Sequence, residues 1–433
     1  MLGIALIPLL GAVGAAVDYS QASATRTAFQ NALDSTALML SKTAALQTSS
    51  ELQAAATNDF NALFIGSNAK NVTVTANYST TSGSQLVLSG SATVNTNFLS
   101  ILGIDTIHIT ASTTSTWGNT RLRVALVLDN TGSMSQSGKI TALKTATNNL
   151  LTQLQTAVVN PGDVYVSIVP FVNAVNLGAT NYAASWIDWT DWNAVNGKCS
   201  STKYTTQSAC VAAHKTWTPA NHNTWNGCVT DRGLPITTGP DLPSAGNYDE
   251  NVNLPVAGNL ATQYPAYQAP SCPQAVMGLN YDWSAMTTEV NNMQAGGSTD
   301  QPIGLVWGWQ TLVGGGPFTA PALDPNYQYQ QVIILLSDGL NTQDRWYGNG
   351  STTSTQVDSR MYDQNGNGTC ANIKAASITI YTIQVNTDGS STSTLLQDCA
   401  SDLGKFFLLT SADEIVTTFG QIGTALSNLR LAR

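Results

Sequence analysis

The hydrophobic pattern begins with an apolar stretch that runs into a helix-forming one. Residues 1–17 are uncharged and apolar, and residues 18–46 are rich in Ala, Leu and Gln and contain no Gly or Pro. This pattern predicts one long helix, residues 1–48, that leaves a membrane and uses its apolar part as an anchor. The apolar part also resembles the hydrophobic region of a signal peptide, which is the alternative. A basic flank that would fix the orientation is not seen before it.

From about Asn71 the period changes to two. Three segments, residues 71–79, 84–96 and 105–117, alternate apolar with polar residues, are enriched in Val, Ile and Thr, and are separated by Gly- or Ser-containing breaks. Alternation of this kind is typical of strands with one buried face. We therefore expect a small antiparallel β-sheet module over residues 49–118.

After residue 118 the pattern changes again. Continuous apolar runs at residues 121–129, 164–171, 329–339 and 376–386 alternate with helical patterns. Strands that are apolar on both faces are typical of a parallel sheet covered by helices on both sides. The fold class expected is α/β, with a doubly wound, mainly parallel sheet over residues 119–171 and 281–433. Residues 172–280 form an insertion within it.

The first of these runs ends in the motif Asp129-x-Thr131-x-Ser133, which places a carboxylate and two hydroxyls in one tight loop. Hard oxygen donors of this kind suit Mg²⁺, Mn²⁺ or Ca²⁺. In doubly wound folds the carboxyl ends of the strands form the ligand edge, so Asp338 at the end of another run and Thr299 in a Gly-Gly-Ser-Thr turn could complete the site. The alternative is an ordinary capped loop, because Asp, Asn, Thr and Ser are common in turns.

The three motifs, in this order, resemble the loops of a von Willebrand factor type A domain with its metal-ion-dependent adhesion site. The resemblance implies a metal held by five residues, with Thr131 in place of the family's first serine: Asp129, Thr131, Ser133, Thr299 and Asp338. Threonine keeps the donor oxygen and adds a methyl group. In that family an open coordination position is filled by an acidic side chain of a partner, which implies a binding protein and not an enzyme.

The complete layout resembles the TadG-like proteins of Flp (Tad) pilus assembly. An apolar run, a long helix, a small Thr-rich sheet and the adhesion domain follow one another in the same order. The resemblance implies partners among other pilus assembly proteins, either TadE- or TadF-like proteins or pilin. It also implies an inner-membrane anchor, with most of the chain in the periplasm or cell envelope or at the surface of a Gram-negative bacterium, and a role in adherence and biofilm formation.

Composition narrows the partners further. Charged residues make up 10% of the chain and the formal net charge is -9, whereas an average soluble protein has roughly 25% charged residues. No cluster of Lys and Arg is present to replace the counterions around phosphate. The composition therefore argues against nucleic acid as a partner.

The six cysteines lack the close pairs that zinc sites need, so disulfides are expected, and with them a location outside the cytoplasm. Cys370 and Cys399 lie in helical patterns on either side of one strand and are predicted to pair. The insertion holds four more cysteines, whose pairing is left open: Cys199, Cys210, Cys228 and Cys272.

The insertion is also rich in tryptophan: Trp186, Trp189, Trp192, Trp217 and Trp225. Exposed aromatic residues would make a candidate partner surface. The alternative is a small core inside a loop-rich subdomain held together by disulfides.

Two other functions are weighed against the adhesion hypothesis. A structural scaffold with a degenerate metal site would tolerate loss of Asp129. A metal-assisted hydrolase would need a general base, and the carboxylates near these loops are those expected to bind the ion.

Overall fold

The computed structural model describes residues 2–41, 43–65, 68–80, 84–117, 120–158, 160–233, 248–325, 327–363 and 365–431. The first residue of the expected anchor and residues 234–247 of the expected insertion lie outside these ranges. The chain forms two compact units. Unit 1 comprises Met1–Thr120, Asp324–Gln328 and Leu429–Arg433, and unit 2 comprises Arg121–Leu323 and Tyr329–Asn428.

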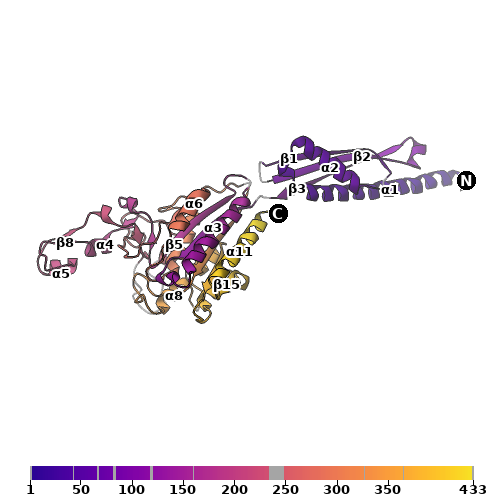
Figure 1. Cartoon of the computed structure of the whole chain (residues 1–433). Coiled ribbons are helices and arrows are strands. Elements are labelled where there is room, and N and C mark those ends of the chain that lie inside the picture. Colours follow the sequence, from indigo (N-terminus) through magenta and orange to yellow (C-terminus); the bar gives the residue numbers. More distant parts are fainter. Residues whose placement is uncertain are drawn as a thin grey trace. The chain divides into compact units, whose positions relative to one another are not determined.

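Unit 1 consists of two helices on a three-stranded antiparallel sheet (Figure 1). The strands pair in the order β1-β2-β3, and α1 packs against β3 while α2 packs against β1. The elements are α1 (Leu2–Leu40), α2 (Ser49–Leu63), β1 (Ala69–Ser79), β2 (Ser84–Asn95) and β3 (Thr106–Trp117), with short 3₁₀ turns at Ala44–Leu46 and Leu99–Leu102.

Alternate residues along the strands point inward and form the core of unit 1. Leu86 and Leu88 are fully buried beneath the helices. The Phe29 ring of α1 lies 4.8 Å from the Phe60 ring of α2. Gly90 continues the inward-facing row, and a Cβ at this position would lie 2.7 Å from Phe29 Cζ, so only glycine lets α1 approach the sheet this closely.

The helix α2 lies within residues 49–118, where the sequence pattern predicted only a small β-sheet module. Its start is a capping box, in which the Thr48 N–H donates to Glu51 Oε2 over 2.8 Å and the Glu51 N–H donates to Thr48 Oγ1 over 3.3 Å. No helix within the described part of the chain is both long and apolar enough to cross a membrane.

Unit 2 is a mixed α/β structure around one six-stranded sheet. The strand order is β12-β5-β4-β13-β14-β15. The pairs β4–β5, β13–β14 and β14–β15 are parallel, and the edge strand β12 is antiparallel to β5. The strands are β4 (Thr120–Asp129), β5 (Val164–Phe171), β12 (Met277–Asn280), β13 (Gln328–Ser337), β14 (Thr379–Val385) and β15 (Phe406–Leu409).

Helices cover both faces of this sheet, as the continuous apolar runs predict. Leu126 of β4 packs into one core with α3, α6 and α11, and its neighbour Val127 packs into the opposite core with α7, α9 and α10. The helices are α3 (Lys139–Thr156), α6 (Trp283–Asn292), α7 (Gln301–Val313), α8 (Thr355–Met361), α9 (Thr369–Ala375), α10 (Thr394–Cys399) and α11 (Asp413–Leu431), with short 3₁₀ turns at Gly132–Ser135 and Leu403–Lys405.

The insertion between β5 and β12 is built from short pieces. Three two-stranded pairs hold it together: β6 (Val175–Asn176) with β10 (Cys228–Val229), β7 (Ile187–Asp188) with β11 (Tyr264–Pro265), and β8 (Gly197–Cys199) with β9 (Trp217–Pro219). The helices α4 (Thr190–Val195) and α5 (Gln207–Ala212) and 3₁₀ turns at Ala179–Asn181, His222–Thr224 and Tyr248–Glu250 complete its described part.

Disulfides cross-link the insertion at two places and join two helices that pack on the sheet. Cys199 is bonded to Cys210 and Cys228 to Cys272, which resolves the pairing left open by the sequence. The third disulfide joins Cys370 of α9 to Cys399 of α10, the pair expected on either side of β14.

Candidate metal centre

The candidate centre lies where the strand order of the unit 2 sheet reverses. Counted in chain order within this sheet, the strands run 3-2-1-4-5-6, so β4 and β13 are the first and fourth strands and lie side by side. Asp129 is the last residue of β4, and Asp338 directly follows β13. Doubly wound sheets bind ligands at this switch point, beyond the carboxyl ends of the strands.

Asp129 is fully buried and held on both carboxylate oxygens. Its Oδ1 accepts the Thr131 N–H over 2.7 Å, and its Oδ2 accepts the Ser337 hydroxyl over 2.6 Å. Burial, followed by the negative charge of Asp338, raises the pKa of Asp129 to about 7, although these hydrogen bonds lower it. Ionisation of Asp129 is thus costly, because its carboxylate is buried and lies near a second one.

The hydroxyls of the first loop, residues 129–133, lie between the two aspartates. Thr131 Oγ1 and Ser133 Oγ lie 3.1 Å apart, and Ser133 Oγ donates to Asp338 Oδ1 over 2.7 Å. The structure therefore brings together four of the five residues expected from the sequence: Asp129, Thr131, Ser133 and Asp338.

Thr299, the fifth expected residue, lies in the second loop, residues 296–299, which contacts the first loop and the third loop after Asp338. The Gly132 N–H donates to the Gly297 carbonyl over 3.0 Å, and the Gly296 N–H donates to the Asn130 carbonyl over 2.7 Å, so the first and second loops lie in contact. The Thr299 N–H donates to Thr342 Oγ1 over 3.0 Å, which ties the second loop to the third. The described interactions of Thr299 are made by its backbone.

Three further residues support the centre and are not part of the sequence motif. Gln301 Nε2 donates to Ser337 Oγ over 2.9 Å, and Ser337 in turn donates to Asp129, so α7 fixes the orientation of the carboxylate. Lys139, at the first position of α3, forms a buried ion pair with Asp338. A signal was present for each, since Ser337 and Gln301 are one or two residues from predicted ligands and Lys139 is the only cation near the first loop.

These donors fit a hard divalent cation. Two carboxylates with hydroxyls offer only oxygen atoms. Burial and then the charge of Asp338 raise the pKa of Asp129, and a cation at the site would favour its ionised form. Within the described ranges, no three His, Cys, Asp or Glu side chains form a group able to hold a metal ion. A cation here would therefore depend on the hydroxyls as much as on the carboxylates.

The tryptophans of the insertion form a small core. Trp192 and Trp225 are buried, and Trp189 stacks on His222 with ring centroids 3.7 Å apart. Trp186 packs against Tyr264, and the Trp217 indole donates to the Asn193 carbonyl over 2.8 Å. None of the five is fully exposed, which favours the mini-core alternative over an exposed partner surface.

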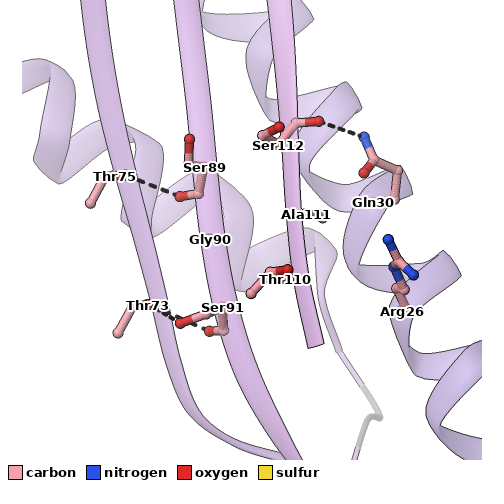
Figure 2. A pocket seen from close by; sticks show the side chains of 10 residues that line it. All are labelled: Arg26, Gln30, Thr73, Thr75, Ser89, Gly90, Ser91, Thr110, Ala111 and Ser112. Atoms are coloured by element: carbon pink, nitrogen blue, oxygen red, sulfur yellow. Dashed lines mark hydrogen bonds between the residues drawn. The ribbon is translucent and has the colours of Figure 1, made fainter. Parts of the chain in front are cut away.

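Unit 1 carries a separate, shallow depression of about 640 Å³. Figure 2 shows that Ser and Thr side chains of the three strands line it, together with Arg26 and Gln30 from α1. Thr73 Oγ1 and Ser91 Oγ lie 2.8 Å apart, and Gln30 Nε2 donates to the Ser112 carbonyl over 3.3 Å. Its polar groups therefore bond largely to one another.

A comparison with protein families finds a match for the N-terminal residues. Residues 1–41 match the family described as putative Flp pilus-assembly TadE/G-like. The N-terminal segment is TadE/G-like. The resemblance inferred from the sequence is thereby confirmed for this segment, which comprises 41 of the 433 residues. No curated protein matches the chain significantly.

Solved structures are similar to the chain at low identity. The pilus adhesin SpaC from Lactobacillus rhamnosus GG is 14% identical over 84% of this chain, with a TM-score of 0.35, and the match spans 35% of the adhesin, about a third of its length. The vWF domain of the type V pili tip protein Mfa5 from Porphyromonas gingivalis is 10% identical over 72% of this chain and 97% of its own, with a TM-score of 0.36. Proximal thread matrix protein 1 from the mussel byssus, in a structure with a zinc-occupied MIDAS motif, is 12% identical over 72% of this chain and 46% of its own, with a TM-score of 0.33.

Proposed function

We propose that this chain is a binding protein of a Flp pilus assembly system, and that it holds a partner through a divalent cation at the candidate metal centre. The observation that carries the proposal is the pair of aspartates with buried side chains at the switch point, linked through Thr131 and Ser133. The TadE/G-like segment supports the pilus context.

The cation would be held by Asp129, Thr131, Ser133 and Asp338, with Thr299 contributing from the second loop. Mg²⁺ is the first choice because the donors are all oxygen, and Mn²⁺ or Ca²⁺ are the alternatives. When bound, it supplies an open coordination position for an acidic side chain of the partner. The chain's own part is to fix the donors, through Gln301 and Ser337 behind Asp129 and through the contacts between the three loops. This is a binding function and no catalytic step is proposed.

Calorimetric titration with Mg²⁺ and Mn²⁺ tests the proposal on the full chain. We expect saturable binding with one site, and a loss of about a hundredfold or more in Asp129→Ala, because the variant removes a charged ligand. Asp402→Ala is the matched control, since Asp402 is an exposed aspartate of unit 2 that pairs with Lys405. Unchanged cation binding in a folded Asp129→Ala variant would contradict the proposed site, and the scaffold alternative would then stand.

The partner is proposed to be another pilus assembly protein that presents a Glu or Asp, in the cell envelope or at the cell surface. We also propose that the apolar N-terminal segment attaches the chain to a membrane. Purified pilin and TadE- or TadF-like proteins are the partners to titrate against the chain, and EDTA should abolish binding as completely as Asp129→Ala does. Flotation of the chain with lipid vesicles, compared with a chain lacking residues 1–17, tests the attachment separately.

A further inference from the structure

Lys139 is placed against the electrostatic preference of its own helix. It is the first residue of the 18-residue helix α3, where the helix dipole disfavours a cation. Its side chain is only 7% exposed, and the Asp338 side chain with which it pairs is 0% exposed. Burying an ammonium at a helix N-terminus is costly unless a specific partner compensates for it. Its ion pair with Asp338 supplies that compensation.

The ion pair lies on an atom that the candidate metal centre needs. Lys139 Nζ contacts Asp338 Oδ2, while Asp338 Oδ1 accepts the Ser133 hydroxyl. A divalent cation bound by Asp338 would lie within a few Å of the ammonium, and at that distance two positive charges repel strongly in a buried site. The ammonium and the cation therefore compete for the same carboxylate.

The charge of Lys139 also acts on a second carboxylate, that of Asp388. Asp388, in the loop after β14, has a lowered pKa, first because Ser390 donates two hydrogen bonds to it and further because of the positive charge of Lys139. This aspartate is solvent-exposed. Of the two carboxylates, that of Asp338 is the buried one and the one that Lys139 Nζ contacts.

We propose that Lys139 is a built-in competitor of the divalent cation for Asp338 and thereby sets the affinity of the centre. This inference rests on the proposed function. It assigns to Lys139 a role in tuning the cation affinity that none of the five predicted ligands has.

Cation titration of Lys139→Met tests the inference, with Lys144→Met as the matched control. Lys144 lies on the same helix, is half-buried, and donates to the Asn291 carbonyl. We expect Lys139→Met to bind Mg²⁺ and Mn²⁺ roughly tenfold more tightly than the wild type, since a competing charge is gone. Lys144→Met should bind like the wild type.

Thermal unfolding with EDTA or excess Mg²⁺ gives an independent readout. Lys139→Met should melt at a lower temperature than the wild type in EDTA and should gain more from Mg²⁺, because Asp338 then has only the cation to neutralise it. If Lys139→Met does not fold, Lys139→Gln, which keeps a hydrogen-bond donor, replaces it in both measurements. Equal affinities in the wild type, Lys139→Met and Lys144→Met would overturn the role of Lys139 and leave the proposed function standing. Absence of binding in all folded variants would overturn both.

Discussion

At the scale of single residues, Arg360 is the cation of a buried ion cluster that includes one loop of the candidate metal centre. Its guanidinium is buried and pairs with three carboxylates, those of Asp231, Asp249 and Asp344. It also lies over the Trp346 ring, with 4.4 Å from Cζ to the ring centroid. Asp344 belongs to the loop that follows Asp338, so this ion cluster holds one of the three loops of the centre. Burial, followed by the charge of Asp231, raises the pKa of Asp344 to about 6, and Arg360 opposes this increase.

Replacing Arg360 by Met should therefore destabilise the protein by about 3–5 kcal/mol near pH 7.5, because it leaves buried carboxylates without their cation. The loss should shrink as the pH falls. The pKa of Asp344 in the folded protein is above its unfolded value and rises further without Arg360, so the folded variant binds more protons than the unfolded chain and gains stability on acidification.

Urea unfolding followed at several pH values measures this effect. Arg345→Met is the control, since Arg345 pairs with the exposed Asp191 and should contribute less than about 1 kcal/mol. A loss in Arg360→Met no larger than that of Arg345→Met would show that the cluster contributes little to stability.

At the scale of elements, the sequence predicted the parts whose periodicity is strong. The strands β1–β3 alternate, β4 and β13 are apolar on both faces, and both patterns are visible without a structure. The helix α2 was missed because its Thr, Asn and Asp residues hide its periodicity, although its Thr48–Glu51 capping box is a signal. In the centre, Asp129, Thr131 and Ser133 share one loop, so their spacing in the sequence was enough to predict them. The contacts of Gln301 with Ser337 and of Lys139 with Asp338 join distant parts of the chain, so they could not be predicted in this way.

The disulfide between α9 and α10 should stabilise unit 2 by constraining its unfolded state. Cys370 and Cys399 are 29 residues apart, and a closed loop of this size is worth about 3–4 kcal/mol in the chain-entropy estimate. The variant Cys370→Ala/Cys399→Ala should lower the free energy of unfolding by that amount, measured by urea unfolding under oxidising conditions.

The variant Cys199→Ala/Cys210→Ala is the comparison for this prediction. These residues are 11 apart and join β8 to α5 within the insertion, away from the main sheet. Its cost should be smaller and should not change cation affinity. A larger loss here than in the Cys370 and Cys399 variant would mean that the insertion governs the stability of unit 2.

At the scale of the whole molecule, the two units have separate cores. The core of unit 1 is formed by α1, α2 and the strands β1–β3, and those of unit 2 lie on the two faces of its own sheet. Cores without shared residues are expected to unfold as separate cooperative transitions. Tryptophan distinguishes the two, because Trp117 is the only one of the ten tryptophans that precedes Arg121.

Excess Mg²⁺ should therefore raise the midpoint of the unit 2 transition only, which is the transition that tryptophan fluorescence reports. At cation concentrations about a hundred times Kd, stabilisation of about 2.7 kcal/mol should raise the midpoint of unit 2 by roughly 5 °C. Differential scanning calorimetry of the full chain should show a second transition that stays in place, and Asp129→Ala should abolish the fluorescence shift. Equal displacement of both transitions, or a shift that persists in Asp129→Ala, would mean that the cation acts on the chain as a whole and not through the three loops at the switch point.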